Sequence, residues 1–257
     1  MIIAQISDTH ILAPESNDPA KTVRADAVQR VINDINTLPK LPDAVIHTGD
    51  LAQNQTRAEY RYLLSLLSDL KMPFYVIPGN RDNRDLLVEI FPNVKKIDID
   101  DPFIHYCVED HDLRLIALDS LGFNSFKGNY SKARLNALRE TLDQNTTQPT
   151  VLFMHHPPFD VADAPDPFQY ETRDAVYALS NVLSNYPNIV RIFCGHAHRA
   201  WLTKLADIPA STMPSTAPDL RKGCYPLRLQ NTPVYQVHHW NGHGDFISTT
   251  QIAQPPR

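Results

Sequence analysis

Five short polar clusters each follow directly on an apolar run of four to six residues, and this pattern constrains the fold more than any other feature of the chain. The apolar runs are rich in β-branched and aromatic residues, as buried strands are. In an open α/β sheet the carboxyl ends of the strands line the ligand crevice, so we expect the clusters to converge on one site. The clusters are Asp8-Thr9-His10, Gly49-Asp50, Gly79-Asn80-Arg81-Asp82, His155-His156-Pro157-Pro158 and Gly195-His196-Ala197-His198.

Amphipathic stretches with helical spacing separate the apolar runs. Thr56, with Glu59 three residues later, forms the pattern of a capping box, and Ser131 is a second expected N-cap. Strands that alternate with helices predict a layered α/β fold. The expected strands are Ile2–Ile6, Ala44–His47, Phe74–Ile77, Leu113–Leu118, Val151–Met154 and Ile189–Cys194, and the expected helices are Thr22–Leu38, Thr56–Leu70, Ser131–Leu142 and Thr172–Ser184.

The pattern changes after about residue 199, where helical periodicity ends. Residues 207–233 hold five prolines and predict a cap-like excursion, which could also form a dimer contact. A second segment rich in Pro and Asp, Asp160–Tyr170, is either an ordinary loop or one that selects the substrate. At 257 residues, we expect 1–257 to form one domain. The expected C-terminal strands, antiparallel and joined by turns, are Trp201–Leu205, Val234–Trp240 and Phe246–Ile252.

Composition excludes several classes of function. The chain has 24 Lys and Arg against 29 Asp and Glu, and no more than two basic residues are adjacent, so generic nucleic-acid binding is not expected. No apolar run approaches the ~18 residues needed to span a bilayer, and the N-terminus lacks the basic region of a signal peptide. Three widely spaced cysteines favour a reducing compartment, so we expect a cytoplasmic protein without membrane contact.

The polar clusters contain carboxylates and imidazoles but no cysteine that could act as a ligand, a combination that suits Mn, Fe, Zn or Co. The candidate ligands are too many for one ion that keeps an open position, and they suit two divalent ions that share a bridging group. A carboxylate can bridge through its two oxygens, and Asp50 is the natural candidate. The candidate ligands are Asp8, His10, Asp50, Asn80, His155, His196 and His198.

The ordered set D-x-H, G-D, G-N-R-D, H and G-H-x-H resembles the calcineurin-like metallophosphoesterases over residues 1 to about 200. Residues 6–10, 154–158 and 194–198 resemble more narrowly the bacterial class III branch, which includes cyclic-nucleotide phosphodiesterases and glycerophosphodiesterases. The resemblance implies a four-layer α/β/β/α sandwich, the metallo-dependent phosphatase fold, with the C-terminal strands supplying much of the second sheet. It also implies a first metal held by Asp8, His10, Asp50 and His198, and a second held by Asp50, Asn80, His155 and His196.

Two residues beside the predicted ligands are the candidate catalytic and substrate-binding residues. Arg81 stands where many family members have histidine; it can hold a phosphate oxygen, but its high pKa prevents useful proton donation. The alternative for Arg81 is an ion pair with Asp82 or Asp85. In the His-His pair the family pattern favours His155 as the ligand. His156 then acts on the substrate side or behind the ligands, or it only packs beside the following prolines.

Two divalent ions, two carboxylates and a bridging hydroxide leave a site charge of about +1, which suits an anionic phosphate ester. We therefore predict a binuclear-metal hydrolase of phosphodiesters, either a cyclic nucleotide such as cAMP or a glycerophosphodiester, that uses metal-bound hydroxide to attack phosphorus. A phosphomonoesterase is the enzymatic alternative, because Arg81 would raise the charge to about +2 and favour a dianion. The alternative from another class is a metal-binding scaffold without turnover, although such loss usually removes ligands and here every ligand position is filled.

Overall fold

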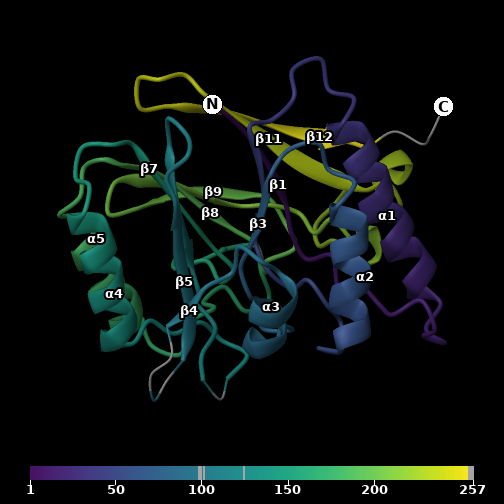
Figure 1. Cartoon of the computed structure of the whole chain (residues 1–257), viewed down its shortest axis with the longest axis horizontal. Helices are drawn as coiled ribbons and strands as arrows, with labels where there is room; N and C mark the ends of the chain where they lie inside the picture. The colour runs from purple at the N-terminus through teal and green to yellow at the C-terminus, as the bar shows by residue number, and fades with distance from the viewer. Residues whose placement is uncertain (98–99, 101, 124, 254–257) are drawn as a thin grey trace.

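The computed structural model describes residues 1–97, 100, 102–123 and 125–253. Two mixed sheets lie face to face between two groups of helices (Figure 1). The order of the five-stranded sheet is β12-β11-β1-β2-β3, and the order of the seven-stranded sheet is β4-β5-β6-β7-β8-β10-β9. Helices α1 (Ala20–Ile35) and α2 (Arg57–Leu67) cover the first sheet, and α4 (Lys132–Asp143) and α5 (Arg173–Leu183) cover the second. The predicted four-layer sandwich is confirmed.

The strand boundaries follow the apolar runs closely. The five-stranded sheet consists of β1 (Ile2–Ile6), β2 (Ala44–His47), β3 (Phe74–Val76), β11 (Val234–Trp240) and β12 (Phe246–Ile252). The seven-stranded sheet consists of β4 (Lys96–Ile97), β5 (Phe103–Val108), β6 (Arg114–Leu118), β7 (Thr150–Met154), β8 (Ile189–Cys194), β9 (Trp201–Leu205) and β10 (Ile208–Thr212). Shorter helical elements are α3 (Arg84–Ile90), η1 (Pro218–Leu220) and η2 (Leu227–Leu229).

Three of the four predicted helix starts are confirmed by their caps, whereas α1 begins at Ala20, before the predicted Thr22, and has no side-chain cap. The Thr56 side chain accepts from the backbone N–H of Glu59, and the Glu59 carboxylate accepts from the N–H of Thr56, which completes the capping box of α2. Ser131 and Thr172 cap α4 and α5 in the same way through their hydroxyls. These caps satisfy N–H groups that the first helical turn leaves without partners.

The middle strands of the second sheet are buried on both faces, which explains their continuous apolar runs. Along β6, Leu115 and Ala117 face the first sheet, whereas Ile116 and Leu118 pack under α4 and α5. Phe153 of β7 and Phe193 of β8 extend the layer between the sheets. This shared layer fixes the two sheets to each other and so fixes the loops at their ends.

Two sequence expectations about the sheets are wrong. The expected C-terminal strands do not share one second sheet: β11 and β12 lie beside β1 to β3, whereas β9 lies in the sheet of β6 to β8. Residues 207–233 are also not wholly an excursion, because β10 is a buried strand that pairs in parallel with β8. The apolar run of a strand has the same pattern whichever sheet it joins, so the sequence does not assign strands to sheets. β10 was not predicted because Pro209 within it argues against a strand. The single-domain prediction for 1–257 stays a prediction.

No helix in the described part of the chain has the length and apolar character needed to cross a bilayer.

Candidate metal centre

The loops after β1, β2, β3, β7 and β8 bring the predicted ligands together at the edge where both sheets end. Ligand atoms of Asp8, His10, Asp50 and His198 lie within 4.8 Å of one another. His10 Nε2 is 3.3 Å from Asp50 Oδ2, and His198 Nε2 is 3.1 Å from Asp8 Oδ1. This first group is the set that the resemblance implies for one metal.

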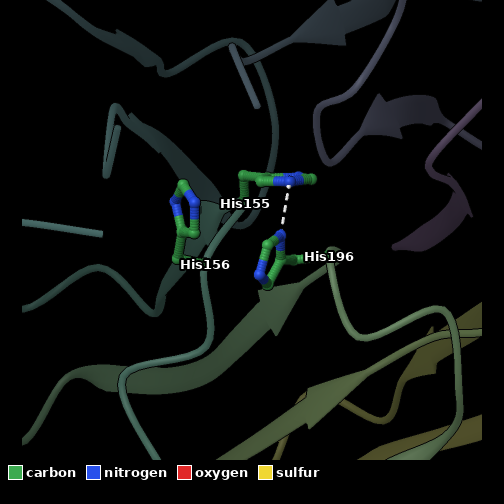
Figure 2. A group of neighbouring side chains, drawn as sticks. All are labelled: His155, His156 and His196. Carbon is green, nitrogen blue, oxygen red and sulfur yellow. Dashed lines mark hydrogen bonds between the residues drawn. The ribbon is translucent and has the colours of Figure 1, made fainter. Parts of the chain in front are cut away.

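The second group lies on the other side of Asp50. Asn80 Oδ1 is 3.1 Å from His155 Nε2 and 2.9 Å from His196 Nδ1. The rings of His155 and His196 point toward each other (Figure 2), and these two nitrogens are 3.1 Å apart. His155 Nε2 is 3.5 Å from Asp50 Oδ1. The Asp50 carboxylate therefore directs one oxygen toward each group.

In each of the four predicted imidazole ligands, one ring nitrogen contacts another protein group and the other ring nitrogen faces the candidate metal centre. His155 Nδ1 donates to the carbonyl of Thr48 at 2.7 Å, and His198 Nδ1 donates to the carbonyl of Leu220 at 2.8 Å. Metal-binding histidines use this pattern, because the outer hydrogen bond fixes the ring and its tautomer. The side chains of Gln53 and Gln169 give matching contacts to His10 Nδ1, at 3.1 Å, and to His196 Nε2, at 2.7 Å.

The backbone at the ligands is held in the left-handed region. Eight described non-glycine residues have positive φ, and five of them are predicted ligands, with φ between 43° and 67°. Such conformations are costly for side chains larger than glycine and persist where the surroundings impose them, often at functional sites. The five are Asp8, His10, Asp50, His196 and His198.

The residues present fit two cations. Asp8 Oδ1 and His10 Nε2 are buried and have no hydrogen-bond partner among the described residues. In the second group two imidazole nitrogens and an amide oxygen, all suited to donate electron pairs, lie within 3.1 Å of one another. Such a cluster needs a positive charge at its centre, and imidazole, carboxylate and amide donors suit borderline divalent metals.

The electrostatics of the site favour charged carboxylates and a neutral His196, whereas Asp8 outweighs burial at His198 and raises its pKa. Burial opposes ionisation of Asp8, but the adjacent His198 outweighs it and lowers the pKa of Asp8 to about 2. Asp50 is also buried, and His155 and His10 hold its pKa well below the ordinary value. Burial, with His155 beside it, lowers the pKa of His196 to about 3. Metal coordination requires these protonation states for Asp8, Asp50 and His196.

Two positioning residues were missed by the sequence reasoning. Asp82 accepts from the backbone N–H of Leu51, Ala52 and Gly79 and from the Tyr60 hydroxyl, so it joins the two loops that carry Asp50 and Asn80. His47 accepts from the N–H of Gly49 and contacts the Thr9 hydroxyl, so it supports the turn before Asp50. The sequence signal for Asp82 was its place in the cluster Gly79-Asn80-Arg81-Asp82. His47 gave no such signal, because its position indicated only the end of a strand.

His156 forms a cluster with His155 and His196 in which one ligand atom of each residue lies within 4.8 Å of the others, but both His156 nitrogens also have contacts outside the cluster. Its Nε2 donates to the carbonyl of Phe126 at 3.0 Å, and its Nδ1 lies 3.0 Å from the Ser120 hydroxyl. Burial, with His196 and His155 beside it, holds its pKa well below the usual value, so the ring is neutral. The contacts support a role in holding the loop that carries Phe126, and a role at the substrate stays a prediction.

Arg81 is an exposed residue, and its backbone N–H donates to Asp50 Oδ1 at 2.7 Å. Its guanidinium carbon lies 5.9 Å from the centre of the Phe126 ring. Among the described residues neither Asp82 nor Asp85 is within ion-pair distance of Arg81; Asp85 pairs with Lys96 instead. The alternative of a structural ion pair is therefore wrong for these two carboxylates, and the contact with phosphate stays a prediction.

Both of the segments rich in proline reach the site. The side chain of Gln169, in Asp160–Tyr170, contacts His196, and Gly128 pairs with Tyr170 in a short parallel bridge. In the C-terminal segment the carbonyl of Leu220 accepts from His198. These segments therefore belong to the support of the metal centre.

Comparison with known proteins agrees with this geometry. The chain is 32% identical over 244 residues to a probable glycerophosphodiester phosphodiesterase, GpdQ, of Arcobacter nitrofigilis, covering 93% of this chain and 89% of that relative. It is 27% identical to the 3′,5′-cyclic adenosine monophosphate phosphodiesterase CpdA of Escherichia coli, covering 97% of this chain and 88% of that one. A dimetal phosphatase from Danio rerio shares the fold, with a TM-score of 0.66 at 13% identity and 99% of each chain covered.

The family model for calcineurin-like phosphoesterases matches residues 1–200, the part of the chain that carries all the predicted ligands. Its members use two divalent metals, in agreement with the two ligand groups around Asp50. This chain belongs to the calcineurin-like phosphoesterase family.

Proposed function

We propose that this protein hydrolyses phosphodiesters at a binuclear centre of two divalent ions, drawn from Mn, Fe, Zn and Co. The observation that carries the proposal is the Asp50 carboxylate, which directs one oxygen toward each ligand group. Asp8, His10 and His198 would hold the first ion, and Asn80, His155 and His196 the second. The names of the phosphodiesterase relatives support this class of substrate.

When bound, the two ions would polarise the phosphoryl oxygens and lower the pKa of water. The protein supplies rings that are already oriented, because each has its outer nitrogen hydrogen-bonded before any ion arrives. Arg81 is fixed through its backbone to Asp50, and its guanidinium is proposed to bind a phosphate oxygen. As arginine stays protonated, its contribution is a fixed charge on the transferring group.

The alcohol part of the substrate has space beside the second ligand group. A cavity of about 390 Å³ opens there, bounded by Asn80 on one side and by Phe123 and Phe126 on the other. Both phenylalanines are largely exposed, at 60% and 69%, so they present apolar surface to whatever occupies the cavity. A diester with a nucleoside or glycerol portion would use this space, whereas inorganic phosphate would leave it empty.

The proposal is tested by reconstituting the protein with Mn, Zn, Co or Fe and measuring turnover of cyclic AMP, glycerophosphocholine, bis(p-nitrophenyl) phosphate and a simple monoester. We expect diesters to be hydrolysed faster than the monoester, and the metal-free protein to be inactive. Preference for the monoester would instead establish the phosphomonoesterase alternative. Tight binding of two ions without turnover of any ester would establish the scaffold.

We also propose that 1–257 folds as one domain, that the protein is cytoplasmic, and that the part of 207–233 outside β10 forms a homodimer contact. The described cysteines are all free, which supports a reducing compartment.

η1 lies within the 207–233 segment and packs against α1, with Asp219 paired to Arg24 at 2.8 Å. Light scattering at several protein concentrations tests the dimer by measuring the molar mass. A monomer at every concentration would contradict this proposal.

A further inference from the structure

A second cavity opens between the two sheets, at a place that includes none of the predicted metal ligands. It has a volume of about 280 Å³ and is bounded by β8, β9 and β10 on one side and by β11 and β12 on the other. Most of its wall surface is apolar, and its polar groups come from β8, β10, β11 and β12. The lining side chains that matter here are Arg191, Trp201, Leu202, Ser211, Gln236 and Ser248.

Arg191 is the one cation among the lining residues, and only 6% of it is exposed. It donates from Nη2 to the Ser211 hydroxyl at 2.8 Å, and its guanidinium carbon lies 5.2 Å from the centre of the Phe193 ring. Its Nε is buried without a hydrogen-bond partner, and no ion pair joins it to a carboxylate in the described part of the chain. A buried guanidinium without a counter-charge is unfavourable, so an anion bound at this position would stabilise it.

The groups around Arg191 do not neutralise it. His238 is fully buried, with Nδ1 2.8 Å from the Ser248 hydroxyl and Nε2 3.1 Å from Gln5 Oε1. Burial and then Arg191 hold the pKa of His238 well below its usual value, so the ring is neutral. Because Ser211 accepts from Arg191, its own hydroxyl proton remains available to donate into the cavity.

We propose that this cavity binds a small oxyanion of the phosphate type, held by the Arg191 guanidinium and the Ser211 hydroxyl. A charged donor beside a hydroxyl gives the short, strong hydrogen bonds that oxyanions form with proteins. The cavity is larger than inorganic phosphate needs, and the apolar side chains of Trp201 and Leu202 leave room for a small organic group on it. This site is independent of the proposed hydrolysis, because none of its residues belongs to the metal centre.

The test is calorimetric titration of the two-metal protein with inorganic phosphate, which can bind both at the metals and at Arg191. Wild type should show two classes of site. Arg191→Gln should weaken one class at least about tenfold, the loss expected for a charge-assisted hydrogen bond, and leave basal ester hydrolysis unchanged. Asp50→Asn should abolish the other class and retain the first. Arg139→Gln, which removes the same charge from α4 at a site whose guanidinium hydrogen-bonds only Asn136 among the described residues, is the matched control and should keep both classes.

A crystal of the wild type soaked in selenate gives a readout that needs no variant. Anomalous density between Arg191 and Ser211 supports the proposal, and density confined to the metal centre overturns it. In solution, unchanged phosphate affinity at both classes of site in Arg191→Gln also overturns it. Failure of the metal centre alone would remove the class that depends on Asp50 and leave the class that depends on Arg191, so the two proposals fail separately.

Discussion

Replacing Asp82 with asparagine tests whether one buried carboxylate holds the metal-binding loops together. Its two oxygens accept from three backbone N–H groups and one hydroxyl, at distances of 2.8 to 3.2 Å. Asparagine has the same shape but keeps only one acceptor oxygen. If asparagine keeps its oxygen at the Oδ1 position, it retains the bonds from Leu51, Ala52 and Tyr60. Its NH₂ group then faces the Gly79 N–H, so two of the five contacts are lost: the bond from Gly79 and the second branch of the bond from Leu51.

Hydrogen bonds to a charged group contribute about 1.5–3 kcal/mol each, so the loss of two predicts a cost of about 3–6 kcal/mol. Part of this is offset, because burial and repulsion from Asp50 raise the pKa of Asp82 to about 6, and asparagine removes that repulsion. We therefore expect a decrease of about 3 kcal/mol in the free energy of unfolding at pH 8, where Asp82 is ionised. Because Asp82 spans the loops of Asp50 and Asn80, metal affinity should fall as well.

The assay is urea unfolding of the metal-free protein at pH 8, followed by titration of the folded protein with metal. Asp85→Asn is the matched control, since Asp85 is three residues away, is 79% exposed at its side chain and pairs only with Lys96 among the described residues. An exposed pair of this kind is worth less than about 1 kcal/mol. If Asp82→Asn costs no more than Asp85→Asn, the carboxylate does not hold the loops and the reasoning fails.

Asp50→Asn should lower the metal content and nearly abolish turnover, because one carboxylate faces both ligand groups; a fully active two-metal variant would refute the bridging role. His155→Ala should lose bound metal, whereas His156→Ala should keep both ions and reduce kcat/KM, and metal content that follows His156 would reverse this assignment. Arg81→Ala should lower kcat/KM about 10- to 150-fold without removing a limb of the pH profile, and unchanged kinetics would place Arg81 away from the substrate. Burial lowers the pKa of His105 to about 4, below the ~6.5 of a histidine in the unfolded chain. The neutral ring therefore stabilises the fold fully above about pH 6.5, and the free energy of unfolding falls by up to about 3 kcal/mol as the pH decreases toward 4. Urea unfolding of His105→Gln should therefore depend less on pH across this window, and an identical slope would contradict the shift.

The convergence of the candidate ligands could be predicted from sequence, because each of them follows closely on a strand that is recognisable by itself. The apolar run Ile2–Ile6 predicts β1 even when the neighbouring strands of the sheet are not known, and Asp8 and His10 lie just beyond its end. The order of the strands in the sheets did not affect this inference. The division of β1 and β7 between two sheets therefore left the prediction of convergence intact.

The supporting residues could not be predicted in the same way, because their roles depend on contacts between segments that are far apart in sequence. Gln169 contacts His196 only because the Asp160–Tyr170 segment folds back over the end of β8. Likewise Arg191 occupies the middle of an apolar strand, where a sequence pattern shows a single charge but not the cavity beside it. Spacing along the chain carries no information about such pairs.

The metal centre is also where the two sheets are joined, so its geometry and the packing of the sheets are one physical problem. The ring of His155, from the second sheet, donates to the carbonyl of Thr48, which follows β2 of the first sheet. The Gly79 loop approaches Asp50 so closely that a Cβ at Gly79 would collide with the Asp50 carboxylate and backbone. A change in the distance between the sheets would therefore move His155 relative to Asp50 and separate the second ligand group from the bridging carboxylate. We therefore expect the apolar layer between the sheets, which includes Phe153 and Phe193, to influence catalysis without touching the substrate, because it sets the separation of the two halves of the proposed site.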